Sequence, residues 1–190
     1  ISLIAAVSLL ESINRLRPFH LVLLYAPLLL PQLAFLFGVQ LLLLQLNIDG
    51  QWWSIVWAHS LFVFPYMVLA MHGPWQAYDQ RYSQIAASLG KSNWRVWWSI
   101  KRPILLKPLC YAAALGFSVS VAQYLSTLFV GAGRFPTLTT EAIALSAGGD
   151  RRTLAALAFV QMAMPMAAFL LAFALPKALR HEQNILRGPA

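Results

Sequence analysis

Residues 84–90 read Gln84-Ile85-Ala86-Ala87-Ser88-Leu89-Gly90, and ten residues after Gly90 the chain continues with Ile100-Lys101-Arg102-Pro103. Both stretches belong to a polar, basic interruption, residues 73–107, between two strongly apolar segments. Long apolar segments cross membranes as helices, so the residues between them must lie at a membrane surface. We call residues 73–107 the surface loop.

The surface loop contains the signals for two short helices separated by a glycine. Residues 84–89 favour one or two helical turns, Gly90 suits a left-handed C-cap, and Ser92 can cap a second helix that runs into Pro103. We call residues 84–103 the knuckle. Ile85, Ala86 and Leu89 are expected to form a small apolar face that fits a groove on another protein. Burying Leu89 alone would contribute roughly 1.5 to 3 kcal/mol.

The knuckle resembles a known motif. Gly90, Ile100 and Pro103 stand at the spacing of the EAA motif of the permease subunits of binding-protein-dependent ABC importers. The similarity extends from about residue 27 to residue 175, and it looks closest to the thiamine and ferric-iron permeases whose two halves are fused in one polypeptide. Three positions depart from the motif: Gln84 stands in place of Glu, Ile85 in place of Ala, and Arg102 in place of Leu.

The resemblance implies a polytopic helical bundle of the type I ABC importer permease class. It implies that residues 73–107 form a cytoplasmic coupling loop that docks into a cleft on ABC ATPase subunits. The docking residues would be Gln84, Ile85, Ala86, Ala87, Ser88, Leu89, Gly90, Ile100 and Pro103. Further implied partners are a periplasmic substrate-binding protein and a second permease half, on the same chain or on a homologous subunit. The neutral amide of Gln84 would hydrogen-bond less strongly than a carboxylate, by about 1 kcal/mol.

Gly90-Lys91-Ser92 looks like the end of a phosphate-binding loop. Position 85 is Ile where that loop needs its first glycine, and no buried strand precedes it. We therefore expect this chain to bind no cofactor, and any ATP to be bound by a partner subunit.

The composition indicates an all-α integral membrane protein. The 190 residues are 59% hydrophobic and 11% charged, whereas soluble domains are typically about a quarter charged. The net charge of +8 is distributed among short loops, which argues against nucleic-acid binding. The single cysteine, Cys110, permits neither an internal disulfide nor a metal cluster. No catalytic motif of a metalloprotease or an esterase occurs, so we expect no enzyme activity and no metal site.

Hydropathy predicts about four complete membrane spans in one permease domain, residues 1–190, with lipid as their surroundings. The spans are residues 21–46, 52–72, 108–130 and 153–175, and residues 131–152 form a periplasmic loop with a short helix over residues 138–147. Pro27 and Pro31 should kink the first span. The apolar run 1–10 is too short to cross alone, so we interpret it as the end of a preceding span, and the chain as the C-terminal part of a longer one.

The charge distribution predicts the orientation. Eleven of the fourteen Lys and Arg residues, including Arg15, Arg17 and Arg187, fall on the side of the surface loop, and three fall on the opposite side. Cytoplasmic loops carry the excess of basic residues, so the surface loop faces the cytoplasm. That is the side on which an ATPase would act. The resemblance implies that the membrane is the bacterial inner membrane.

The spans carry polar but no charged side chains, which counts against a proton-coupled carrier. Gly116, Ser120, Gln123 and Thr127 fall on one helical face of the third span. Two explanations are open: a close helix-packing face, or a lining of the substrate pathway formed by Ser120, Gln123 and Thr127. The same question applies singly to Gln40, His59 and Gln161, for which we expect interhelical hydrogen bonds.

The sequence favours a permease subunit of an ATP-driven ABC importer, coupled to a cytoplasmic ATPase through residues 84–103. A passive channel or facilitator and a non-transporting membrane scaffold are the alternatives. Arg134 and Glu141 in the outer loop could contact a binding protein or simply be solvated. The transported substrate is not fixed by these residues, although the resemblance favours a thiamine-like molecule or a metal chelate.

Overall fold

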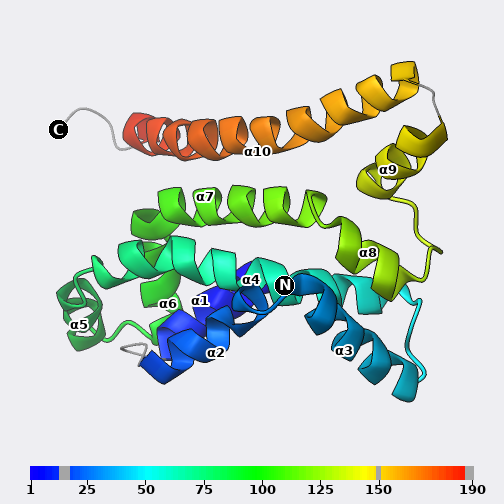
Figure 1. The fold of residues 1–190 in the computed structure, drawn as a ribbon. Helices are drawn as coiled ribbons and strands as arrows, with labels where there is room; N and C mark the ends of the chain where they lie inside the picture. Colours follow the sequence, from blue (N-terminus) through cyan, green and yellow to red (C-terminus); the bar gives the residue numbers. More distant parts are fainter. Residues whose placement is uncertain (13–17, 149–150, 187–190) are drawn as a thin grey trace.

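The computed structural model describes residues 1–12, 18–148 and 151–186 (Figure 1). Within these ranges every regular element is a helix, which confirms the predicted all-α class. The helices are α1 (Ser2–Ser12), α2 (Pro18–Leu29), α3 (Gln32–Gln45), α4 (Trp52–Gln76), α5 (Arg81–Ser88), α6 (Asn93–Val96), the π-helix η1 (Trp97–Lys101), α7 (Arg102–Val121), α8 (Tyr124–Gly131), α9 (Leu138–Gly148) and α10 (Arg151–Leu186).

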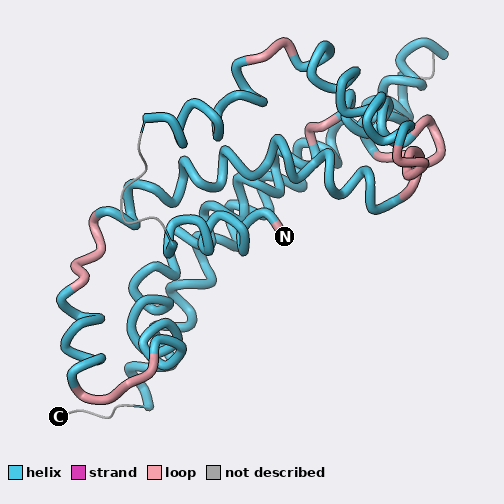
Figure 2. Tube along the Cα trace, turned by 90° about the horizontal axis from the view of Figure 1, so that it is seen from below, coloured by secondary structure: helices cyan, strands magenta, loops and turns pink. Residues whose placement is uncertain are grey.

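The helices are stacked in layers around α4 and α7. These two pack side by side, α1 lies against α4, and α10 covers the opposite side of α7 (Figure 1). Seen from below, long helices are joined by short loop segments (Figure 2). The bundle therefore has α7 at its centre, between α4 and α10.

A hydrophobic core lies where α1, α4 and α7 meet. Ala6, Met71 and Ala112 are completely buried there. Gly116 lets α7 approach α4 so closely that an added Cβ would lie 1.9 Å from the Cε atom of Met67. Small residues at such crossings are typical of helices packed within a membrane.

Three helical stretches of the described chain are long and apolar enough to cross a membrane. They are Trp52–Gln76, Asn93–Val121 and Arg151–Leu179. The last is about 43 Å long at 1.5 Å per residue, more than the roughly 30 Å of a hydrocarbon core. Its large apolar side chains, such as Phe159 and Leu170, are exposed, as expected where lipid or a further helix surrounds the bundle.

The first predicted span is not a single kinked helix. Residues 21–46 form α2 and α3, and Val22–Leu29 and Gln32–Gln45 meet at an angle of 104°. Pro27 stays inside α2, whereas Pro31 caps α3 with φ −54° and ψ 119°. Proline removes one helical hydrogen bond and excludes the preceding residue from the helical region, so the chain breaks at Leu30-Pro31. The bend expected at Pro31 is thus present but much sharper than a kink, and the two helices are either one broken span, the fourth of the described residues, or a re-entrant pair.

The third predicted span is also divided, and its boundaries shift. Residues 108–130 contain the end of α7 at Val121, a break at Ala122-Gln123, and then α8. At the other end, helix continues without interruption from Asn93 to Val121, so the second helix of the knuckle and the third span are one rod. Helix α4 likewise runs through Pro74 to Gln76. The connection between α4 and this rod is therefore much shorter than the predicted surface loop, residues 73–107.

A wider helical turn accommodates Pro103 within the continuous rod. Residues Trp97–Lys101 form the π-helix η1, immediately before Pro103. In a regular α-helix the ring of Pro103 would collide with the carbonyl group of Ser99, four residues earlier. The extra residue of a π-turn relieves such a collision without breaking the helix.

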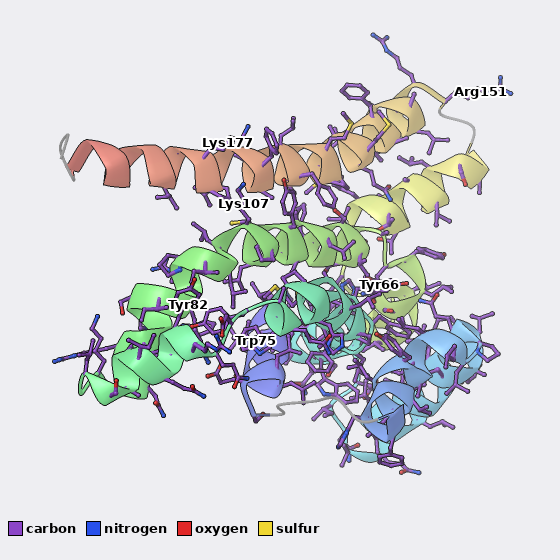
Figure 3. All side chains as sticks on the ribbon, turned by 90° about the vertical axis from the view of Figure 1, so that its left-hand side faces the viewer. Tyr66, Trp75, Tyr82, Lys107, Arg151 and Lys177 are labelled. Carbon is purple, nitrogen blue, oxygen red and sulfur yellow. The ribbon has the colours of Figure 1, made fainter. Side chains whose placement is uncertain are left out.

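The basic residues of the two loop regions lie at opposite ends of the bundle. Arg81, Lys91 and Arg95 lie at the end that carries α5, and Arg134 and Arg151 lie at the end that carries α8 and α9 (Figures 1 and 3). This arrangement agrees with the predicted orientation. Arg15, Arg17 and Arg187, which the charge count also used, lie outside the described residues. The predicted outer helix is present as α9, packed on α8 and α10.

Candidate functional site

A glycine C-cap ends helix α5 within the knuckle. Gly90 has a φ of +75°, which favours glycine. Its N–H donates to the carbonyl oxygen of Ala87 at 2.9 Å, and the N–H of Lys91 donates to that of Ala86 at 3.1 Å. These two bonds make a Schellman motif at the end of α5, as the sequence predicts for Gly90. The turn between α5 and α6 is therefore fixed by backbone hydrogen bonds.

The knuckle presents two large apolar side chains to its surroundings. Ile85 on α5 is 59% exposed, and Leu89, four residues later at the C-cap of α5, is 75% exposed. Ala86 does not share their face, because it is only 4% exposed on a helix that packs against α6 and η1. The expected apolar face of three residues is thus a pair, and Ala86 belongs to the base of α5.

The other residues predicted for docking on this turn are also exposed. Gln84, Ala87, Ser88 and Gly90 all lie on the surface, whereas Ile100 and Pro103 are half-buried in the rod below. The hydroxyl group of Ser88 donates to the carbonyl oxygen of Ile85. A surface of exposed residues, 84–85 and 87–90, is therefore supported by buried and half-buried ones.

Lys101 connects the base of the knuckle to two neighbouring helices. Its Nζ atom forms an ion pair with Glu11 at the end of α1. The same atom lies 5.7 Å from the ring centre of Trp75 and 5.9 Å from that of Tyr78. Figure 3 shows Trp75 at this end of the bundle. The side chain of Lys101 thus holds the end of α1, the end of α4 and the rod together.

A ring of hydrogen bonds joins α4 to α7 and α8 at the other end of the rod. Around His59 of α4, Nδ1 lies 3.0 Å from the hydroxyl oxygen of Ser120 and Nε2 lies 2.8 Å from that of Thr127. The Nε2 atom of Gln123 donates to the carbonyl oxygen of His59 at 3.1 Å. The hydroxyl of Thr127 donates to the carbonyl oxygen of Gln123 at 2.9 Å.

The donors in this ring can be assigned. Thr127 has one hydroxyl proton, which it gives to the carbonyl oxygen of Gln123, so it must accept from Nε2 of His59. A neutral imidazole with its proton on Nε2 then accepts from the hydroxyl of Ser120 at Nδ1. We call His59, Ser120, Gln123 and Thr127 the polar ring.

The polar ring brings together three of the four residues predicted on one helical face, Ser120, Gln123 and Thr127. They bond to His59 across the helix interface, which confirms the interhelical hydrogen bonds expected for His59. Both explanations of this face, close packing and pathway lining, stay predictions. Within the described residues Gln40 and Gln161 make no such bond. Sequence reasoning missed that Gln123 lies at a helix break, and the only signal was a polar residue in an apolar span.

Two buried polar atoms beside the polar ring lack partners among the described residues. They are the Oε1 atom of Gln123 and the hydroxyl oxygen of Ser126. Gln123 is 6% exposed and Ser126 is completely buried. A carbonyl oxygen can only accept, so the amide atom that faces the carbonyl oxygen of His59 must be Nε2. The amide atom without a partner is therefore Oε1. Gln123 therefore retains a free acceptor.

Comparison with known proteins found relatives of one kind. No protein-family model matches. The chain is 43% identical over 164 residues to the inner membrane ABC transporter permease protein YnjC of Escherichia coli, covering 86% of this chain and 32% of that protein. It is 30% identical over 87 residues to the molybdenum transport system permease protein ModB of Mycobacterium tuberculosis, covering 45% and 33%.

A further relative is the spermidine/putrescine transport system permease protein PotC of Escherichia coli, 24% identical over 127 residues, covering 67% of this chain and 48% of that protein. The chain thus spans about a third of the length of YnjC and of ModB and about half that of PotC. These relatives are transporter subunits of the membrane, and the helical bundle with its long apolar helices agrees with them. The chain is an inner-membrane protein, similar over 86% of its length to an ABC transporter permease.

Proposed function

We propose that this chain forms part of the permease of an ATP-driven importer and couples to a cytoplasmic ABC ATPase through residues 84–103. The observation that carries the proposal is the exposed pair Ile85 and Leu89 on a helix whose base is fixed. An exposed apolar pair on a short, rigid helix is the form that a docking element takes in helix-in-groove recognition. The partners would be ABC ATPase subunits, a periplasmic substrate-binding protein and a second permease half.

The proposed coupling follows the rod. A displacement of α5 would be transferred through η1 and Pro103 to α7, because the helix from Asn93 to Val121 is uninterrupted. The far end of that helix lies at the polar ring, where Ser120 and Gln123 bond to His59 on α4. Movement of the knuckle would therefore act on the contact between α4 and α7, which is the contact that a pathway would have to open.

In this proposal the nucleotide binds to the partner. Lys91, which gives the knuckle its likeness to a phosphate-binding loop, uses its N–H to cap α5. Gly90 is also committed to that cap, so the two residues do not form an open cradle for phosphate. The expectation of a thiamine-like or metal-chelate substrate stays a prediction. The printed names of ModB and PotC refer to molybdenum and to spermidine and putrescine, and those substrates are stated only of those proteins.

A cysteine cross-link tests the proposal. In a Cys110→Ala background of the full-length permease, Ala87→Cys or Ser88→Cys is co-expressed with its candidate ATPase, and membrane vesicles are cross-linked with and without ATP. Both positions are exposed beside Leu89. We expect a cross-link whose yield changes with ATP. Ala147→Cys, exposed on α9 at the opposite end, is the matched control. Equal capture from Ala147→Cys, or no capture from the knuckle, would contradict the proposal and favour a passive channel or a scaffold.

A further inference from the structure

The two helix breaks of the bundle meet at a cavity of about 330 Å³. Its lining includes the end of α2 (Pro27, Leu30), the start of α3 (Gln32), the end of α7 (Ala122), and the side chains of Tyr66 and Gln123. Leu30 and Gln32 are exposed and Gln123 is buried, so the cavity leads from an open mouth to a buried end. Tyr66 is on the α4 wall (Figure 3).

Helix breaks leave backbone groups without intrahelical partners. The last carbonyl groups of α2 and the first N–H groups of α3 are such groups. At the end of α7, by contrast, the carbonyl oxygens of Ser118 and Ser120 accept from the N–H groups of Ala122 and Gln123. Within a membrane, irregular backbone is tolerated where it lines a cavity or is covered by protein. A cavity bounded by two helix breaks is therefore more polar than the apolar surface around it.

The buried end of the cavity holds an unsatisfied acceptor. Gln123 lines the cavity and is 94% buried, and its Oε1 atom has no hydrogen-bond partner among the described residues. Its Nε2 atom is committed to His59, so the amide cannot turn to pair its oxygen without losing that bond. The Oε1 atom is enclosed, so neighbouring side chains must shift before an N–H or O–H group of a ligand reaches it and supplies the missing partner.

We propose that this cavity binds a small uncharged polar solute with N–H or O–H donors, held by Gln123, Gln32 and Tyr66. No Lys, Arg, Asp or Glu lines the cavity, so a full charge would be desolvated there without a counter-charge. At about 30 Å³ for each water molecule, the cavity has the volume of roughly ten waters, which suits a small solute. This proposal rests on the proposed permease function, because the cavity is part of a transport pathway only if the protein is a permease.

Binding is tested without ATPase or nucleotide. Saturation-transfer NMR on the full-length permease in nanodiscs detects weak contacts, using acetamide, glycerol and myo-inositol as uncharged probes, and succinate and putrescine as charged ones. We expect saturable signals from at least one uncharged probe and none from the charged ones. Tyr66→Phe and Gln32→Leu should each weaken that binding about two- to tenfold, the range of one lost hydrogen bond.

The matched control is Gln40→Leu, which removes a second amide of α3 outside the cavity lining. It should leave the probe signals unchanged. The proposal is overturned if no uncharged probe binds saturably, if the charged probes bind equally well, or if Gln40→Leu weakens binding as much as Gln32→Leu does. Because the readout needs no nucleotide, failure here leaves the cross-linking result standing, and failure of the cross-link leaves this result standing.

Discussion

Truncation of the exposed apolar pair should weaken ATPase docking while leaving the permease folded. Complete burial of a Leu or Ile side chain contributes roughly 1.5 to 3 kcal/mol. Leu89 and Ile85 are 75% and 59% exposed, so about 1 to 2 kcal/mol remains to be gained by each on docking. For Ile85→Ala combined with Leu89→Ala we expect a loss of about 2 to 4 kcal/mol, or roughly thirty- to several-hundred-fold in affinity.

The assay compares affinity with stability. Binding of the ATPase to the full-length permease in nanodiscs is titrated, and thermal unfolding of each variant is followed separately. The melting temperature should stay within the range of surface substitutions, because neither side chain is packed in the isolated bundle. Leu170→Ala is the control, since Leu170 is 67% exposed on α10 and loses the same atoms away from the knuckle.

Two results would refute the reasoning. Unchanged ATPase affinity in the double variant would remove the pair from the docking surface. An equal loss in Leu170→Ala would show that the effect comes from apolar area in general. Leu89→Asp sharpens the comparison, because a carboxylate pressed into an apolar groove costs more than a missing side chain. ATP-dependent uptake that survives Leu89→Asp would contradict the coupling role as a whole.

Three further predictions concern the packing beneath the knuckle and at the polar ring. Gly116→Leu should destabilise the bundle by about 1 to 3 kcal/mol, because even a Cβ would lie 1.9 Å from Met67 Cε, and Met67→Ala should recover part of that loss in thermal unfolding. Thr127→Val should cost about 1 to 3 kcal/mol by leaving a buried donor unpaired, whereas Ser126→Ala, which removes a hydroxyl without a partner, should be neutral or stabilising. Lys101→Met should lower ATPase-coupled transport more than stability, since it breaks only the ion pair and the ring contacts that position the knuckle; transport equal to that of the unchanged protein would contradict this.

The sequence predicted the local features of the knuckle because local chemistry determines them. A positive φ at Gly90 and a helix ending before it follow from the preferences of glycine, and both are present. Exposure was less accessible to prediction. Ala86 was expected beside Ile85 and Leu89, but the packing of α5 on α6 and η1 turns it inward. That packing depends on the path of the chain after Gly90, which composition does not report.

The broken spans could not be predicted from hydropathy, which measures how apolar a segment is and not its direction. Residues 21–46 are equally compatible with a kink or with a break, and the 104° bend decides between them only in the folded chain. Neither Gly nor Pro marks the break at Ala122-Gln123. There Gln123 bonds to His59, 64 residues away in the sequence, and a contact over that distance leaves no local pattern.

The polar ring and the rod together explain how a small free energy of docking at the knuckle would change the structure at the cavity. Hydrogen bonds between membrane helices average about 0.6 kcal/mol, so the three that cross from α4 to α7 and α8 together hold about 2 kcal/mol. Coupling energies between distant sites are typically about 1 to 3 kcal/mol, which is the same size. The ring is thus strong enough to fix one arrangement of α4 and α7 and weak enough to be exchanged for another. Because Gln123 belongs both to the ring and to the cavity wall, a rearrangement of the ring would change the cavity directly.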